Sequence, residues 1–96
     1  MNEPLPTMEE VRKKFHKTFL ELVGIELIRF EPGNVMIEVK VRDQLRNLVG
    51  LVHGGVFATM LDVVMGFAIR SLTGRGALTV QMDVRYFAPV TEGTMT

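Results

Sequence analysis

Apolar residues recur at helical spacing near the start of the chain. Five of them follow intervals of three or four: Met8, Val11, Phe15, Phe19 and Leu22. This is the pattern of an amphipathic helix with one buried face. Thr7 precedes Glu10 by three residues, as in a capping box, and Gly24 is a typical stop signal. The pattern predicts one helix of about four turns between these signals.

Strict alternation replaces the helical period over residues 25–30 and 34–42, which predicts two strands. One face of the second strand is apolar: Val35, Ile37, Val39 and Val41. Between the strands, Pro32 and Gly33 take the second and third places of a four-residue turn, which is typical of type II. The two strands should therefore form a hairpin.

A second helix is predicted from the His53-Gly54-Gly55 turn to Leu72, because nearly every position there is apolar. Asp62 and Arg70 interrupt this stretch, so it reads poorly as a membrane span. Residues 78–88 alternate again and predict a third strand, and residues 94–96 look like the start of a fourth. The pattern predicts an α+β fold.

Three strands and one long apolar helix would cover each other poorly. We therefore expect residues 1–96 to form a single but incomplete domain whose C-terminal strands are missing.

Composition narrows the function classes. Eleven basic and eleven acidic residues cancel, which argues against nucleic acid as a partner. There is no cysteine, and the two histidines show no metal-ligand spacing, so a structural zinc site is not expected. No secretory signal or membrane segment is evident, and we expect a soluble cytoplasmic protein without a membrane partner.

The long helix carries one thin polar seam. It spans about 80° of arc and consists of Gly55, Thr59, Asp62, Gly66, Arg70 and Thr73. Asp62 is the only acid on the helix, and a carboxylate in such a place is costly unless it is paired or hydrogen-bonded. It could serve as a general base, or it could simply lie on an exposed stripe; the helix alone does not decide.

The His53-Gly54-Gly55 turn opens the same helix. The first amides of a helix lack internal partners, and glycine lets a substrate carbonyl approach them, so they could form an oxyanion hole. By itself the motif favours a plain turn with His53 as a satisfied polar side chain. Asn47 and Thr79 are likewise ordinary loop and strand residues when taken alone, although either could contact a reacting group.

Helix geometry restricts how these residues can cooperate. His53 and Asp62 are nine positions apart, which is about 13.5 Å along a helix axis. A base and an oxyanion donor must both lie within about 3 Å of one reacting group. If both are catalytic, they must come from different subunits, so the enzyme hypothesis requires at least a dimer.

Three segments in this order resemble the PaaI-type hotdog thioesterases. They are Asn47-Leu-Val-Gly50-Leu-Val-His53-Gly54-Gly55, then Asp62, then Thr79-Val-Gln-Met-Asp-Val-Arg-Tyr86-Phe-Ala-Pro89. The resemblance runs from about Gly24 to the end of the chain. Each motif is loose by itself, and the combination is fairly specific.

The resemblance implies a hotdog fold, in which a curved antiparallel sheet wraps around the long helix, and homodimers that often pair into homotetramers. It implies an acyl-CoA substrate, with Asp62 as general base or nucleophile and the Gly54 amide polarising the thioester carbonyl. It also implies that no metal or cofactor is needed. His53 would support the turn or contact the thioester. Asn47 would place the water or carbonyl, and Thr79 would lie near the acid.

Other functions remain open. A non-catalytic acyl-CoA-binding hotdog module could keep the glycine turn, but it would not need Asp62 and Asn47. The chain could also be an inactive fragment of a thioesterase. A hotdog hydratase is disfavoured, because an aspartate followed five residues later by histidine is absent: Leu48 stands five after Asp43.

Overall fold

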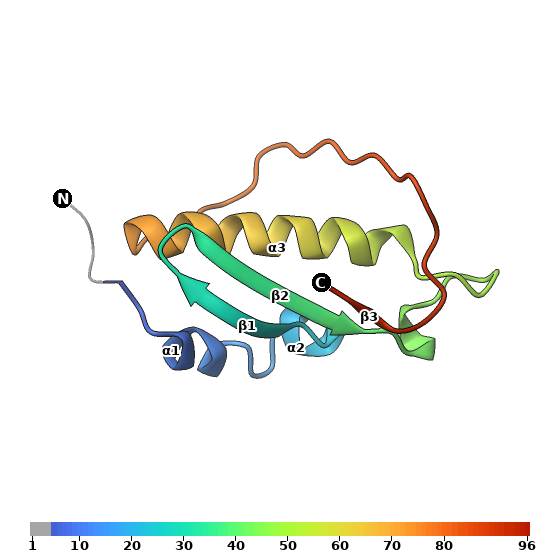
Figure 1. Ribbon diagram of the computed structural model, residues 1–96, viewed down its shortest axis with the longest axis horizontal. Helices are drawn as coiled ribbons and strands as arrows, with labels where there is room; N and C mark the ends of the chain where they lie inside the picture. Colours follow the sequence, from blue (N-terminus) through green and yellow to red (C-terminus); the bar gives the residue numbers. More distant parts are fainter. Residues whose placement is uncertain (1–4) are drawn as a thin grey trace.

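A computed structural model describes residues 5–96 of the chain (Figure 1). The elements run in the order α1 (Met8–Lys13), α2 (Phe19–Val23), β1 (Glu26–Glu31), β2 (Asn34–Lys40), the 3-10 turn η1 (Asp43–Leu45), α3 (Gly54–Thr73) and β3 (Thr94–Met95). The hairpin of β1 and β2 lies along α3, and β3 joins the free edge of β2 to complete a three-stranded antiparallel sheet.

The N-terminal helix is broken, so the prediction of one continuous four-turn helix was wrong. Lys17 has a positive φ of 61°, which interrupts the helical ladder between α1 and α2. The break accompanies a long-range contact, since the ring of Phe15 stacks on Phe67 of α3 at 5.7 Å. Both end signals are confirmed: Thr7 forms the capping box of α1, and Gly24 caps α2 with φ 87°.

The predicted hairpin is confirmed. Glu31 pairs with Asn34, which leaves Pro32 and Gly33 as the two turn residues. Gly33 has a φ of 70°, as the third place of a type II turn requires. The pairing shifts register between Leu27 and Arg29, and such a bulge changes which residues face the core. Leu27 is 2% exposed while Ile28 is 39% exposed.

The core lies between the hairpin and one side of α3. Each helix and strand contributes at least one buried apolar residue to it. These residues are Val11, Val23, Ile25, Leu27, Ile37, Val39, Leu45, Val52, Val56, Met60 and Met95. Among residues 5–96, Ser71 is the one polar residue buried with them. Its hydroxyl accepts the Gly33 N–H at 2.9 Å and donates to the Ala68 carbonyl at 2.7 Å, which ties the hairpin turn to the end of α3.

Residues 78–88 do not form the predicted third strand. They run along α3 as an extended segment, which Figure 1 shows in orange to red arching above the helix. Within residues 5–96 no strand lies beside them, so their backbone groups have no ladder partners, and Leu78 and Val80 are 95% and 98% exposed. The return to the sheet near residue 94 is confirmed, because Met95 pairs with Val39.

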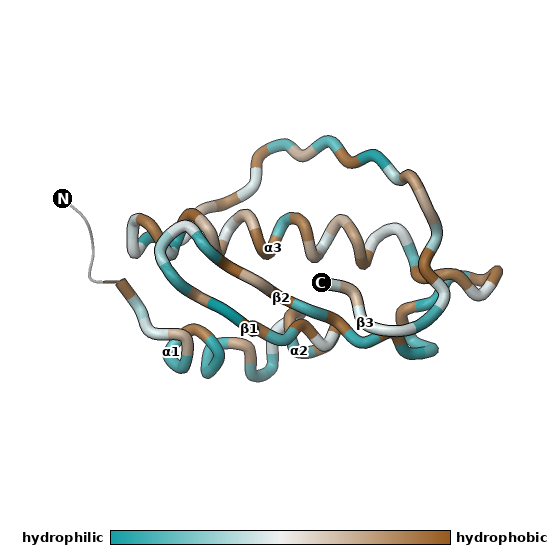
Figure 2. The backbone as a smooth tube through the Cα atoms, in the orientation of Figure 1, coloured by the Kyte–Doolittle hydropathy of each residue, from teal (hydrophilic) through white to brown (hydrophobic). Residues whose placement is uncertain are grey.

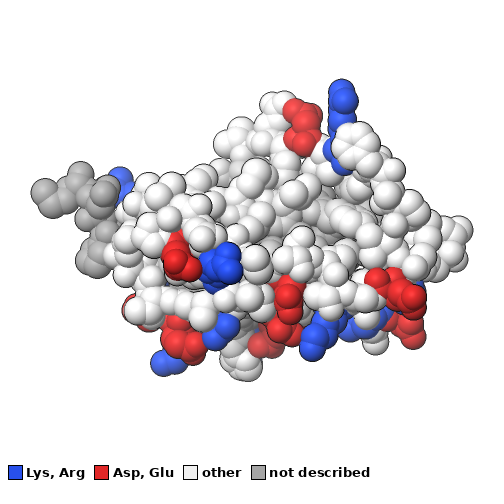
Figure 3. All heavy atoms as spheres, viewed as in Figure 1, with Lys and Arg blue, Asp and Glu red and all other residues white. Residues whose placement is uncertain are grey.

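Helix α3 is less covered than its sequence predicted. Leu61, Met65 and Ile69 recur every four residues, form an apolar stripe and are each nearly half exposed. Figure 2 shows the apolar character of the helix, and Figure 3 shows that charged side chains gather along α1, α2 and the hairpin instead. The length and apolarity of α3 would suffice to span a membrane, a test that core helices of soluble proteins also pass. One side of α3 packs on β1 and β2, while only 17% of its most apolar stretch is buried within the described residues.

Candidate active site

Asp62 lies in the middle of α3 and is half-buried. Its carboxylate oxygen Oδ1 accepts a hydrogen bond from the hydroxyl of Thr79, which the segment 78–88 carries across the helix. The structure thus brings together two residues that are far apart in sequence. The bond satisfies one carboxylate oxygen and fixes the side chain while leaving the second oxygen available.

The His53-Gly54-Gly55 turn forms the N-terminus of α3. His53 is the N-cap residue, and its Nδ1 accepts the Gly55 N–H at 2.9 Å. An accepting Nδ1 carries no proton, so in the neutral ring the proton is on Nε2. The His53 carbonyl accepts the Val56 N–H at 2.9 Å. Among the described residues the Gly54 N–H has no acceptor, so it is free to bind a ligand oxygen.

Tyr86 also belongs to this turn, although the sequence indicated only its place on a strand face. Its hydroxyl donates to the Gly54 carbonyl at 2.8 Å. Its ring meets Phe57, one turn into α3, edge to face at 6.0 Å. Tyr86 is the only tyrosine in the chain, but nothing in the local sequence indicates that its hydroxyl reaches a residue 32 positions away.

Asn47 lies in the loop that precedes α3. Its side-chain oxygen Oδ1 accepts the N–H groups of Val49 and Leu51, both at 3.0 Å, so the amide shapes its own loop. This leaves the Nδ2 amino group as the part of the side chain that can serve a ligand. Asn47 and Gly54 line the same small hollow of about 330 Å³.

Asp62 and Thr79 border a different groove, of about 1110 Å³, between α3 and residues 76–81. Arg70 shares this groove, and its Nε is buried without an acceptor among the described residues. Gly54 and Asp62 are eight positions apart on one helix, which is about 12 Å along its axis. Within one chain, therefore, the candidate residues form two separate sites.

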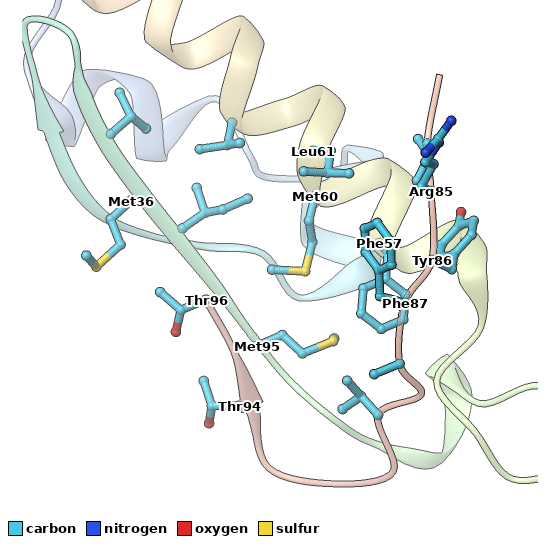
Figure 4. Close-up of a pocket in the computed structure, with 16 residues that line it drawn as sticks. Met36, Phe57, Met60, Leu61, Arg85, Tyr86, Phe87, Thr94, Met95 and Thr96 are labelled. Atoms are coloured by element: carbon cyan, nitrogen blue, oxygen red, sulfur yellow. The ribbon is translucent and has the colours of Figure 1, made fainter. Parts of the chain in front are cut away.

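An apolar hollow of about 700 Å³ opens between α3, the strands β2 and β3, and residues 84–88 (Figure 4). Its wall includes Met36, Phe57, Met60, Phe87 and Met95. None of the five candidate residues lines it. Across residues 5–96, no three histidine, aspartate or glutamate side chains are grouped as a metal site would require.

Comparison with known proteins decides the family. A sequence model described as the Thioesterase superfamily matches residues 49–96. This range is half of the chain and holds four of the five candidate residues, all but Asn47. Acyl-coenzyme A thioesterase 13 of Homo sapiens is 34% identical over 98 residues, which cover 97% of this chain and 69% of that protein. The chain belongs to the thioesterase superfamily. The prediction of a thioester hydrolase is therefore confirmed.

Solved structures agree with this assignment. The thioesterase chain superposes on the PaaI protein of the E. coli phenylacetic acid degradation operon with a TM-score of 0.76, over 90% of this chain and 63% of that one. At 20% identity this likeness concerns the fold alone. The protein smu.793 of Streptococcus mutans, solved with acetyl CoA bound, gives a TM-score of 0.71 at 28% identity, over 83% of this chain and 64% of that one. The expected hotdog architecture and the PaaI-type resemblance are confirmed.

Proposed function

We propose that this thioesterase hydrolyses acyl-CoA thioesters to a free acid and CoA, and that each active site combines Asp62 of one subunit with Gly54 of another. The names of its relatives support the substrate class, since one is an acyl-CoA thioesterase and another was solved with acetyl CoA bound. The pairing of Asp62 with Thr79 carries the proposal, because it holds a lone carboxylate in an otherwise mostly apolar groove.

The reaction needs an oxygen nucleophile and a place for negative charge. As a general base, Asp62 takes a proton from water while the water oxygen bonds to the thioester carbon. The carbonyl oxygen becomes negative, and the free Gly54 N–H at the positive end of α3 would stabilise it. The carbon–sulfur bond then breaks, and the CoA thiolate leaves and is protonated. As a nucleophile, Asp62 would instead form a mixed anhydride that water hydrolyses.

A second subunit follows from the separation of the two sites. Gly54 and Asp62 of one chain lie about 12 Å apart along α3, too far to contact one carbonyl group. Residues 78–88 are extended and have no strand beside them within residues 5–96, so their backbone could pair with the same segment of another copy. Such pairing would bring Thr79 and Asp62 toward the partner's helix.

The remaining candidates have supporting roles. Asn47 would donate its Nδ2 amino group to the thioester oxygen or to the attacking water, because its Oδ1 already holds the loop. His53 would act chiefly through the backbone, since its Nδ1 is engaged by the Gly55 N–H. The Thr79 hydroxyl would keep Asp62 oriented toward the substrate.

Thiol release from acetyl-, hexanoyl-, palmitoyl- and phenylacetyl-CoA tests this function. We expect hydrolysis of at least one of these substrates, and its loss in Asp62→Ala. Asp62→Asn is the matched variant, because it keeps the size of the side chain and the ability to accept from Thr79 but cannot act as a base. If no member of the panel is hydrolysed, the chain is a binding module or an inactive form. An Asp62→Ala variant with wild-type activity would refute the catalytic role of Asp62.

A single turnover in ¹⁸O-labelled water separates the two roles of Asp62. A general base delivers labelled oxygen directly into the product acid. If Asp62 is the nucleophile and water attacks the aspartyl carbon of the mixed anhydride, the first product carries one of the unlabelled Asp62 oxygens. An unlabelled first product therefore identifies the nucleophile.

A further inference from the structure

We propose that Tyr86 is a positioning residue for the oxyanion donor, and that with His53 it clamps the peptide that follows Gly54. This inference rests on the proposed function, since it concerns how the Gly54 N–H is held for the thioester oxygen. It assigns a task to a side chain that is not among the five candidate residues.

The peptide group between Gly54 and Gly55 is held at both ends. Its carbonyl oxygen accepts from the Tyr86 hydroxyl at 2.8 Å. Its N–H donates to Nδ1 of His53 at 2.9 Å. A peptide unit is planar, so fixing both polar groups fixes the orientation of the whole unit.

The preceding peptide group, between His53 and Gly54, is held at one end only. Its carbonyl accepts the Val56 N–H at 2.9 Å, while its N–H has no acceptor among the described residues. Gly54 therefore sits between two anchored peptide planes. The one group left unbound is the N–H that the mechanism uses. Glycine has the widest backbone freedom of all residues. A glycine at this position therefore depends on such anchoring more than another residue would.

The Tyr86 side chain is itself well placed for this task. Figure 4 shows its ring beside Phe57 at the first turns of α3. A Cβ atom added to Gly54 would lie 3.4 Å from the phenol ring, so the ring closes over this glycine. Just beyond Tyr86 the chain is anchored again, where Val90 accepts the Val52 N–H at 2.8 Å. The hydroxyl is therefore delivered from a segment fixed close to the turn.

Preorganised donors stabilise developing charge because they need not reorient during the reaction. Loss of the Tyr86 hydroxyl should loosen the Gly54 N–H without removing it. One neutral hydrogen bond to a partly exposed group corresponds to a fall of about three- to tenfold in kcat. KM should change little, because the effect lies in the transition state rather than in substrate binding.

The test compares Tyr86→Phe with wild type on the best substrate of the acyl-CoA panel. Thr73→Val is the matched control, because the Thr73 hydroxyl makes the same kind of bond to a helix carbonyl, that of Ile69 at 3.0 Å, at the opposite end of α3. We expect kcat to fall in Tyr86→Phe alone, with urea midpoints similar in the two variants.

A second measurement separates positioning from general support of the fold. If Tyr86 acts through the Gly54 N–H, then Tyr86→Phe should have no further effect on kcat once Gly54→Pro has removed that N–H. Equal kcat in wild type and Tyr86→Phe, or a full additional loss in the Gly54→Pro background, would overturn the inference. Absence of hydrolysis by wild type would instead overturn the proposed function, so the two failures are distinguishable.

Discussion

Replacing Gly54 by proline should remove the proposed oxyanion donor with little damage to the fold. Proline lacks the N–H, and in the described structure that N–H has no acceptor, so no internal hydrogen bond is lost. Gly54 is the first residue of α3, a position where proline is favoured because its fixed φ suits a helix start. His53 has φ −62° and ψ 136°, the extended backbone that a residue before proline prefers.

These geometric facts set the expected magnitudes. Losing one oxyanion donor lowers kcat by about 10²- to 10³-fold. The free energy of unfolding should stay the same or rise by up to about 1 kcal/mol, because proline restricts the unfolded chain. Gly54→Ala is the control, since alanine keeps the N–H and its Cβ would meet the Tyr86 ring at an ordinary 3.4 Å.

Steady-state thiol release and urea unfolding together make the assay. We expect Gly54→Pro to be folded and nearly inactive, and Gly54→Ala to be folded and active. A folded Gly54→Pro variant with wild-type kcat would refute the assignment of the Gly54 amide. Equal losses in the two variants would show that shape at this position matters rather than the donor.

Three further predictions concern the cap, the acid and the core. His53→Ala should lower the free energy of unfolding by about 1 kcal/mol. His53→Asn should keep most of the stability, since asparagine also caps helices. An unchanged urea midpoint in the alanine variant would contradict the capping role of His53. Thr79→Val should lower kcat about tenfold by releasing Asp62, whereas Thr79→Ser should stay close to wild type; a fully active valine variant argues against this positioning. Leu27→Ala should lower the free energy of unfolding by about 2–5 kcal/mol, and Ile28→Ala should lower it by under about 1 kcal/mol. Similar losses in the two variants would contradict the position of the bulge.

The features that the sequence predicted correctly depend on near neighbours. The capping box of Thr7 and Glu10 and the Pro32-Gly33 turn are each complete within four residues. The α+β fold follows from the change between helical and alternating periods. The single domain, cytoplasmic location and lack of cofactor or nucleic-acid partner stay predictions.

The features that the sequence missed depend on distant contacts. The break at Lys17 accompanies the stacking of Phe15 on Phe67, which lies 52 positions away. The alternation in residues 78–88 was read as a strand, but a strand needs a neighbour, and none lies beside it in the described chain. The reach of Tyr86 to the helix start likewise has no local signal. The sequence pointed to the candidate residues one by one, and their catalytic roles stay predictions. The structure adds which of them lie together.

A mixed dimer tests the two-subunit site most directly. Asp62→Ala and Gly54→Pro chains with different affinity tags are produced together, and only dimers holding both tags are kept. One site of each mixed dimer then combines an intact Asp62 with an intact Gly54, and the other has neither. Each variant alone should be nearly inactive, while the mixed dimer should recover about half of the wild-type activity per dimer. A mixed dimer as inactive as its parents would contradict a site shared between subunits.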